Sequence, residues 1–189
     1  GQPCEADTVP TVDALIGGNV SLGADSQSLV AAVDGVLHVD PETGSLTVRH
    51  AEHVEFDLYT PVPMETEADL IVAGGVREGT GVNCGRGASL YVKGDLLANA
   101  TASDIVIGAA IRSGAAGQST VIAAQSLTTG TIASANVQTG GNLRVGDEII
   151  RANVRCGGAL TGPSATISAS TLLVTGPIEC KVVGAEDHT

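Results

Sequence analysis

A short unit repeated between residues 90 and 183 constrains the fold of this chain more than any other feature of its sequence. Leu127 and Val137 recur one unit later as Leu143 and Val154, at offsets of 16 and 17 residues. Within a unit, branched apolar residues fall at about every fifth or sixth position. This spacing excludes an amphipathic helix, which needs apolar residues at three- and four-residue steps. The unit instead predicts three short strands separated by small or polar corner residues.

A repeated strand unit cannot bury its apolar side alone, so successive units must stack and share one elongated core. We therefore expect an all-β fold, a right-handed parallel β-helix (β-solenoid) with a small N-terminal β element; the handedness follows from the rule for parallel crossovers. The composition agrees, because aromatic residues make up only 2% of the chain, whereas globular cores draw much of their buried area from large rings. Glycine pairs such as Gly140-Gly141 and Gly157-Gly158 predict corners that need positive φ or close backbone approach.

Three segments are expected along the chain: an N-terminal β element and lead-in at 1–69, the solenoid at 70–184 and a tail at 185–189. Turn residues from Asp40 to Gly44 predict a hairpin loop with a proline at its second position. Short strands of the N-terminal element are expected at residues 12–20, 29–33, 36–39 and 46–48.

Two further features of the chain carry structural expectations. The only aromatic cluster, VEFDLYTPV at residues 54–62, is expected to form a packed joint, with Phe56 and Leu58 facing the same side of a strand. One unit is longer than the others, since Ile105 to Leu127 spans 22 residues and the next step spans 16. A loop containing Gly114 to Gly117 must therefore bulge from the stack, and we interpret it as structural slack rather than a binding loop.

The charge of the chain restricts its partners. With 21 acidic and 9 basic residues, the formal net charge of −12 disfavours nucleic acid and anionic lipid, both of which need clustered Lys and Arg. The chain has no run of 18 apolar residues, so membrane insertion is not expected. Much of the acid precedes Leu70, which favours a polar cap there.

The four cysteines are expected to be free thiols. They form no CxxC pair, so neither a zinc site nor a redox motif is indicated. Cys84 and Cys156 lie about four turns apart, roughly 19 Å at the strand spacing of a sheet, and cannot bond to each other. A bridge between Cys156 and Cys180 in neighbouring turns, or one involving Cys4, stays open. Free thiols favour a reducing compartment.

No catalytic, cofactor-binding or metal site is predicted. His50, Glu52, His53 and Glu55 come closest to a metal cluster, but strand alternation turns the two imidazoles to opposite faces, so we interpret them as a solvated strand edge. His38 and His188 have no nearby partner of a suitable type. The sequence also lacks the GxxxxGK[ST] phosphate loop, which argues against a nucleotide cofactor.

The acidic residues in the regular units are candidates for the catalytic acids of a polysaccharide lyase or hydrolase, since such enzymes also use parallel β-helices. Their sites need converging carboxylates on one face. Asp95 and Asp104 lie at different phases of the unit, and Asp147-Glu148 is interpreted as a solvated corner. We therefore expect no enzymatic activity.

Two stretches carry a family resemblance: VAGGVREGTGVNCGRGASLYVKGDLL at 72–97 and IASANVQTGGNLRVGDEIIRANVRCGGAL at 132–160. They resemble the β-solenoid of bacterial flagellar assembly protein A and its relatives, in which an alanine stands two residues before each inward valine, as Ala135 stands before Val137 and Ala152 before Val154. The resemblance covers residues 12 to 184. More distantly, the repeat is similar to the β-helices of bactofilins and of the C-terminal domain of the septum inhibitor MinC.

The resemblance implies a cytoplasmic bacterial protein that acts in flagellar placement or assembly through protein contacts, with no catalytic residues to transfer. We therefore expect a non-catalytic scaffold or protein-binding module that presents its solenoid faces to a protein partner. The alternative is a filament subunit that stacks end to end with itself, as bactofilins do. A secreted or cell-surface location is the alternative if a leader was removed before Gly1.

Overall fold

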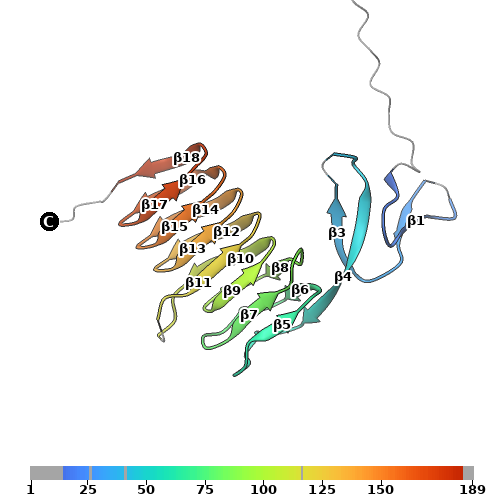
Figure 1. Ribbon diagram of the computed structural model, residues 1–189, viewed down its shortest axis with the longest axis horizontal. Coiled ribbons are helices and arrows are strands. Elements are labelled where there is room, and N and C mark those ends of the chain that lie inside the picture. Colours follow the sequence, from blue (N-terminus) through green and yellow to red (C-terminus); the bar gives the residue numbers. More distant parts are fainter. Residues whose placement is uncertain (1–14, 26, 41, 116, 185–189) are drawn as a thin grey trace, which may run out of the picture. The chain divides into compact units, whose positions relative to one another are not determined.

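The computed structural model describes residues 15–25, 27–40, 42–115 and 117–184, and this part of the chain is all-β without an α-helix (Figure 1). The chain divides into two compact units, Gly1–Ala51 and Glu52–Thr189. The second unit is a stack of parallel turns, which confirms the predicted β-solenoid.

The first unit consists of two antiparallel pairs of strands. β1 (Val20–Leu22) pairs with β2 (Leu29–Ala31), and β3 (Gly35–Val39) pairs with the first residues of β4 (Leu46–Val54). Asp40 closes the β3–β4 loop, because the backbone N–H groups of Glu42 and Thr43 each donate to its carboxylate at 2.8 Å. The predicted hairpin is confirmed, while the proline expected in its loop lies outside the described residues. Of the strand expected at 12–20, residues 12–14 lie outside the described residues, and among residues 15–20 only Val20 belongs to a named strand.

The strands of the second unit follow one another with short corners. They are, in chain order, β5 (Met64–Thr66), β6 (Asp69–Val72), β7 (Gly81–Cys84), β8 (Leu90–Val92), β9 (Asn99–Ala102), β10 (Ile105–Arg112), β11 (Thr120–Ala123), β12 (Leu127–Ala133), β13 (Asn136–Thr139), β14 (Leu143–Ile150), β15 (Asn153–Cys156), β16 (Leu160–Ser168), β17 (Thr171–Val174) and β18 (Ile178–Val183). One sheet stacks β18-β16-β14-β12-β10-β8-β6, and the facing sheet of seven strands stacks β17-β15-β13-β11-β9-β7-β5.

Three rows of inward side chains run along the stack and form its core. The first row, in register from turn to turn, is Leu70, Leu90, Ile105, Leu127, Leu143, Leu160 and Ile178. The second row is Leu58, Val76, Leu96, Ile111, Ile132, Ile149, Ile167 and Val183. The third row, on the seven-stranded sheet, is Met64, Val82, Ala100, Val121, Val137, Val154 and Leu172.

The three rows correspond to the three inward segments predicted for each unit, but each turn has two strands rather than the three that were predicted. From β10 onward the first two rows share one long strand, which bends between them at a register shift, for example between Ile107 and Ala110. In earlier turns the second row is held only by isolated bridges, such as Val76 to Leu96. The register Leu127 to Leu143 and Val137 to Val154 is the one that the repeat predicted.

The glycine pairs at 140–141 and 157–158 serve close approach rather than positive φ. A Cβ on Gly140 would lie 2.2 Å from the carbonyl oxygen of Ala124, and one on Gly157 would lie 2.2 Å from that of Gly140. Positive φ occurs at other corners, both at glycines such as Gly79, with 82°, and at non-glycine residues such as Ser134, with 55°. Of the two reasons that the sequence left open for these glycine pairs, backbone proximity is therefore the operative one.

The stack begins earlier than residue 70, where the solenoid was expected to start. Leu58 bridges to Val76 in parallel, and β5 already pairs in parallel with β7. The division between the two compact units falls after Ala51.

Within the aromatic cluster at residues 54–62, Phe56 and Leu58 do not face the same side, contrary to the expectation. Phe56 and Tyr59 are 80% and 70% exposed, whereas Leu58 is buried in the second row. The chain bends at residues 55 and 56, directly after β4, so the strand alternation that would have put Phe56 and Leu58 on one side is broken.

The long unit places its extra residues at one corner, as predicted. They lie between the end of β10 at Arg112 and the start of β11 at Thr120, while the corresponding corner between β12 and β13 holds only residues 134 and 135. The strands on both sides of the insertion keep their parallel register with the neighbouring turns.

Candidate binding surface

Acidic and amide side chains at the corners connect each turn to the next. The carboxylate of Asp95 accepts the backbone N–H of Ala110 at 3.0 Å, and that of Asp104 accepts the backbone N–H of Ser126 at 3.1 Å. The same contact joins Asp69 to Ser89, Asn99 to Thr120 and Asn142 to Ala159, at 2.8, 2.8 and 2.9 Å. These oxygens satisfy corner N–H groups, which gives the side chains a structural role.

Asp95 and Asp104 lie at two different corners of the turn, as predicted, because Asp95 precedes the second row and Asp104 precedes the first. Asp147 and Glu148 lie in β14 at its register shift. The structure therefore does not bring these four acids together as a pair of converging carboxylates.

Asp57 is both a corner acceptor and an ion-pair partner. It accepts the backbone N–H of Gly75 at 2.7 Å and pairs with the guanidinium of Arg77, one turn further along. These two groups hold the pKa of the Asp57 carboxyl below its ordinary value. Asp95 and Arg112 form a longer ion pair of the same kind, at 3.8 Å.

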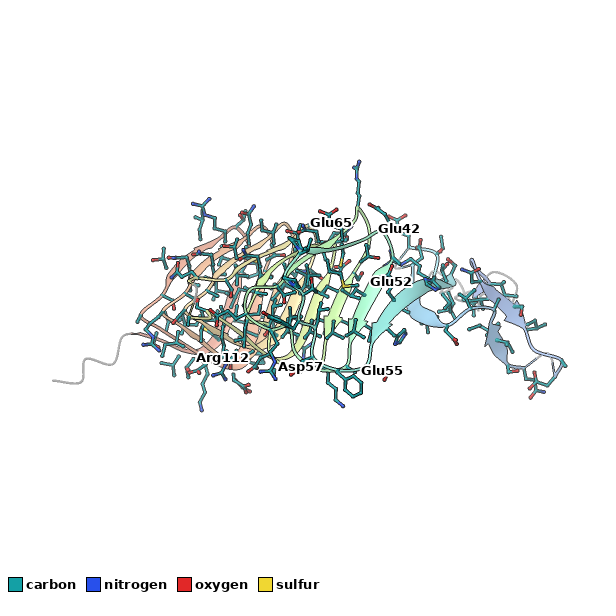
Figure 2. All side chains as sticks on the ribbon, turned by 90° about the horizontal axis from the view of Figure 1, so that it is seen from below. Glu42, Glu52, Glu55, Asp57, Glu65 and Arg112 are labelled. Carbon is teal, nitrogen blue, oxygen red and sulfur yellow. The ribbon has the colours of Figure 1, made fainter. Side chains whose placement is uncertain are left out.

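The residues considered for a metal cluster do not converge. In Figure 2, Glu55 lies at the lower edge of the ribbon, whereas Glu52 lies well above it. Glu52 accepts a hydrogen bond from the Thr66 hydroxyl at 2.8 Å, and both His50 and His53 are exposed on β4. Across residues 15–25, 27–40, 42–115 and 117–184, no group of three or more His, Cys, Asp or Glu side chains is arranged to hold a metal ion.

Cys84, Cys156 and Cys180 are free thiols, and Cys4 lies outside the described residues. Cys84 and Cys156 are buried four turns apart on the seven-stranded sheet, as the repeat predicted. Cys180 is half-buried on β18 and is a free thiol, so the bridge to Cys156 that the sequence left open is not formed.

Cys84 is expected to make the protein less stable at alkaline pH. Burial, with smaller contributions from the Asp69 and Glu52 carboxylates, raises the pKa of its thiol to about 11. The unfolded thiol ionises near its ordinary pKa of 9.0, so between these values the folded state binds more protons and stability falls as pH rises. We expect a loss on the order of 2 kcal/mol between pH 9 and 11.

Urea denaturation at several pH values tests this prediction, with Cys84→Ala as the comparison. The wild-type protein should lose more stability than the variant across this window. Equal pH slopes for the two proteins would show that the buried thiol does not contribute.

The outward side of the seven-stranded sheet is the candidate binding surface within the described residues. Outward positions on β11, β13, β15 and β17 form two rows, and we call the surface that they make the outer face. The row nearer the corner is Thr120, Asn136, Asn153 and Thr171, and the second row is Ile122, Gln138, Arg155 and Leu173. Together they line a shallow groove of about 470 Å³.

The outer face is ordered by side-chain hydrogen bonds between neighbouring turns. The amide of Asn153 donates to Asn136 at 3.1 Å, and that of Asn136 donates to Gln118 at 3.2 Å. Adjacent members of each row are about 4.8 Å apart, the spacing of strands in a sheet. The second row begins and ends with an exposed apolar side chain, Ile122 at 38% and Leu173 at 65% exposure.

Arg155 is the one charged side chain among the residues that line this groove. It lies between Gln138 and Leu173 in the second row. A flat surface with one cation, amides and flanking apolar side chains can bind an extended segment that carries apolar and carboxylate groups.

Sequence reasoning did not find the outer face. The period identifies which residues point inward, but outward residues vary freely, so the sequence gives no signal that Ile122 and Leu173 share one surface. Only the register of β11 through β17 brings these residues into one row.

The inward rows, the corner hydrogen bonds and the parallel register define a β-solenoid repeat protein. No helix in the described residues could span a bilayer. Residues 33–189 match the family model of the Flagellar Assembly Protein A beta solenoid domain, and the chain belongs to this family. No curated protein and no solved structure matched the chain.

Proposed function

We propose that this chain is a non-enzymatic scaffold of flagellar assembly in the bacterial cytoplasm, and that its outer face binds a protein partner. The observation that carries the proposal is the groove in which the cation Arg155 lies next to exposed Leu173, with exposed Ile122 at the other end of the same row. Apolar side chains on an outward row add nothing to the solenoid core, whereas they gain free energy when a partner covers them.

The family membership supports a role in flagellar assembly, and the use of corner acids in backbone hydrogen bonds supports a non-enzymatic one. The partner should present an extended segment with apolar side chains and at least one carboxylate, the group that pairs best with a guanidinium.

Site-specific photocrosslinking tests the proposal. A photoreactive amino acid at Ile122 is expected to give a discrete protein adduct in extract of the source cell. The same amino acid at Val106 is the matched control, because Val106 is also 38% exposed but lies on β10 in the other sheet. The substitution Arg155→Glu should reduce the Ile122 adduct about tenfold or more, as expected for loss of a buried charge pair. Equal adducts at both positions, or none at Ile122, would contradict the proposal.

Self-association through the end of the solenoid is the second candidate function. The observation that favours it is the exposure of inward apolar side chains on the last turn, Ile178 and Val183. An end-to-end filament would show a mass in light scattering that climbs without limit as the protein concentration rises.

A further inference from the structure

The groove on the outer face runs along the axis of the stack, between the two rows of side chains. The two rows hold residues that are two positions apart on one strand, such as Asn136 and Gln138, so about 7 Å separates the rows. Val137 and Val154 lie between the rows and line the floor of the groove. A helix with its side chains is about 10–12 Å wide and does not enter so narrow a space, whereas one extended segment does.

The second row determines where apolar side chains of such a segment can bind. Its two apolar members, Ile122 and Leu173, are three turns apart, which is about 14 Å at the spacing of strands in a sheet. An extended chain rises about 3.4 Å per residue, so four residues span the same distance. Side chains alternate between the two sides of an extended segment, so its residues i and i+4 both face the second row. A polyproline II helix repeats its facing only about every 9 Å and would match one of the two positions.

The centre of the segment is the place for a carboxylate. Its residue i+2 also faces the second row, at about 7 Å from either end, which is midway between Gln138 and Arg155. The amide of Gln138 and the guanidinium of Arg155 can both donate to a carboxylate there. Within the described residues, Arg155 takes part in neither of the two ion pairs reported above, so the ligand displaces no acid of the chain. The formal net charge of −12 disfavours further acids in the segment.

The first row faces the intervening residues of the segment. Residues i+1 and i+3 lie about 3 and 10 Å along the groove, close to Asn136 and Asn153 at about 5 and 10 Å. The amide of Asn153 donates to Asn136, and that of Asn136 donates to Gln118. An amide has two N–H donors, so one on each asparagine can bind an oxygen of the ligand. Short polar side chains such as serine, threonine or asparagine suit both positions.

We propose that the outer face selects an extended segment that reads apolar, polar, acidic, polar, apolar, with the acidic residue bound to Arg155 and Gln138. The inference rests on the proposed function, because it names the segment that the partner presents to the same groove. The pattern is the same in both chain directions, so either direction places the acid between these two residues. Moving the acid by one residue turns it toward the first row. One additional residue between the apolar side chains turns the second of them away from the second row.

Fluorescence anisotropy of labelled peptides, titrated with the full chain, tests the pattern. The peptide GSLTETLSG carries it, and GSLETTLSG has the same composition with the acid moved by one residue. GSLTETTLSG has one more residue between its leucines. The first peptide is expected to bind about threefold to fivefold more tightly than either control, the range for one exposed ion pair. Equal binding of the three peptides, or no binding of the first at millimolar concentration, would overturn the proposal.

Variants of the chain assign the acid to Arg155. Arg155→Glu should abolish the preference for GSLTETLSG and bind GSLTKTLSG, in which lysine replaces the acid, more tightly. Ile122→Ser should weaken binding of GSLTETLSG. The matched control is Val106→Ser, because Val106 is also 38% exposed but lies on the other sheet, and it should leave binding unchanged. Circular dichroism checks that each variant is folded. An Arg155→Glu variant that still prefers the acidic peptide would contradict the assignment.

The peptide titrations and the photocrosslinking at Ile122 can fail independently. Photocrosslinking in extract tests whether a protein binds the outer face, and the peptides test which segment the groove selects. An adduct at Ile122 together with equal binding of the three peptides would overturn the pattern and leave the proposed function standing. A preference for GSLTETLSG without any adduct would support the pattern and contradict the proposed function.

Discussion

Replacement of Leu143 by alanine is expected to lower the free energy of unfolding by about 2–5 kcal/mol. Leu143 is fully buried in the first row, between Leu127 and Leu160 of the neighbouring turns. The narrow core has few other side chains that can shift into the space, so the cavity should persist. The matched control is Arg144→Ala, since Arg144 is the next residue on the same strand and is exposed, and it should change stability by no more than about 0.5 kcal/mol.

Urea denaturation of both variants measures this difference. Alanine at the end of the row, Ile178→Ala, should cost less than half as much as Leu143→Ala, because Ile178 is already 49% exposed. A Leu143→Ala variant as stable as Arg144→Ala would be incompatible with the continuous core.

Replacement of Gly157 by alanine is the second large effect, with an expected cost of about 3 kcal/mol or more. The new Cβ would lie 2.2 Å from the carbonyl oxygen of Gly140, which is backbone of the preceding turn. A flexible side chain could move aside, but this carbonyl cannot shift without separating two turns. The control is Gly146→Ala, where the nearest atom would be the Cα of Gly130 at an ordinary contact distance of 3.5 Å.

Thermal unfolding of the two glycine variants gives the comparison. Gly157→Ala should melt well below the wild-type protein, and Gly146→Ala should melt near it. If the two variants melted together, then the corner glycines would not be needed for the close approach of turns.

The core could be predicted from the sequence because stacking in register converts a sequence period directly into contacts. Leu127 and Leu143 stand 16 residues apart, and they are partners for that reason. Strand edges in a solenoid pair only with the same part of the next turn, so one aligned pair determines the neighbouring pairs. The free thiols of Cys84 and Cys156 were placed four turns apart by the same reasoning.

Features without a repeat were harder to predict. Phe56 was predicted to face the same side as Leu58 because the strand was expected to continue through residues 55 and 56. The chain in fact bends there. Hydrogen bonds accepted by corner residues such as Asp104 depend on the exact position of a backbone N–H one turn away, which the sequence pattern does not specify. The outer face was missed because its outward side chains are not constrained by packing.

The insertion between β10 and β11 also shows where this fold tolerates change. The corner carries several more residues than its counterpart one turn later, yet β10 and β11 keep register with the turns on both sides. Residues added at this corner therefore do not change the spacing between successive turns. A foreign peptide grafted at Gly114 would therefore be displayed at a fixed height on the stack, which makes this corner a natural site for an engineered epitope or affinity tag.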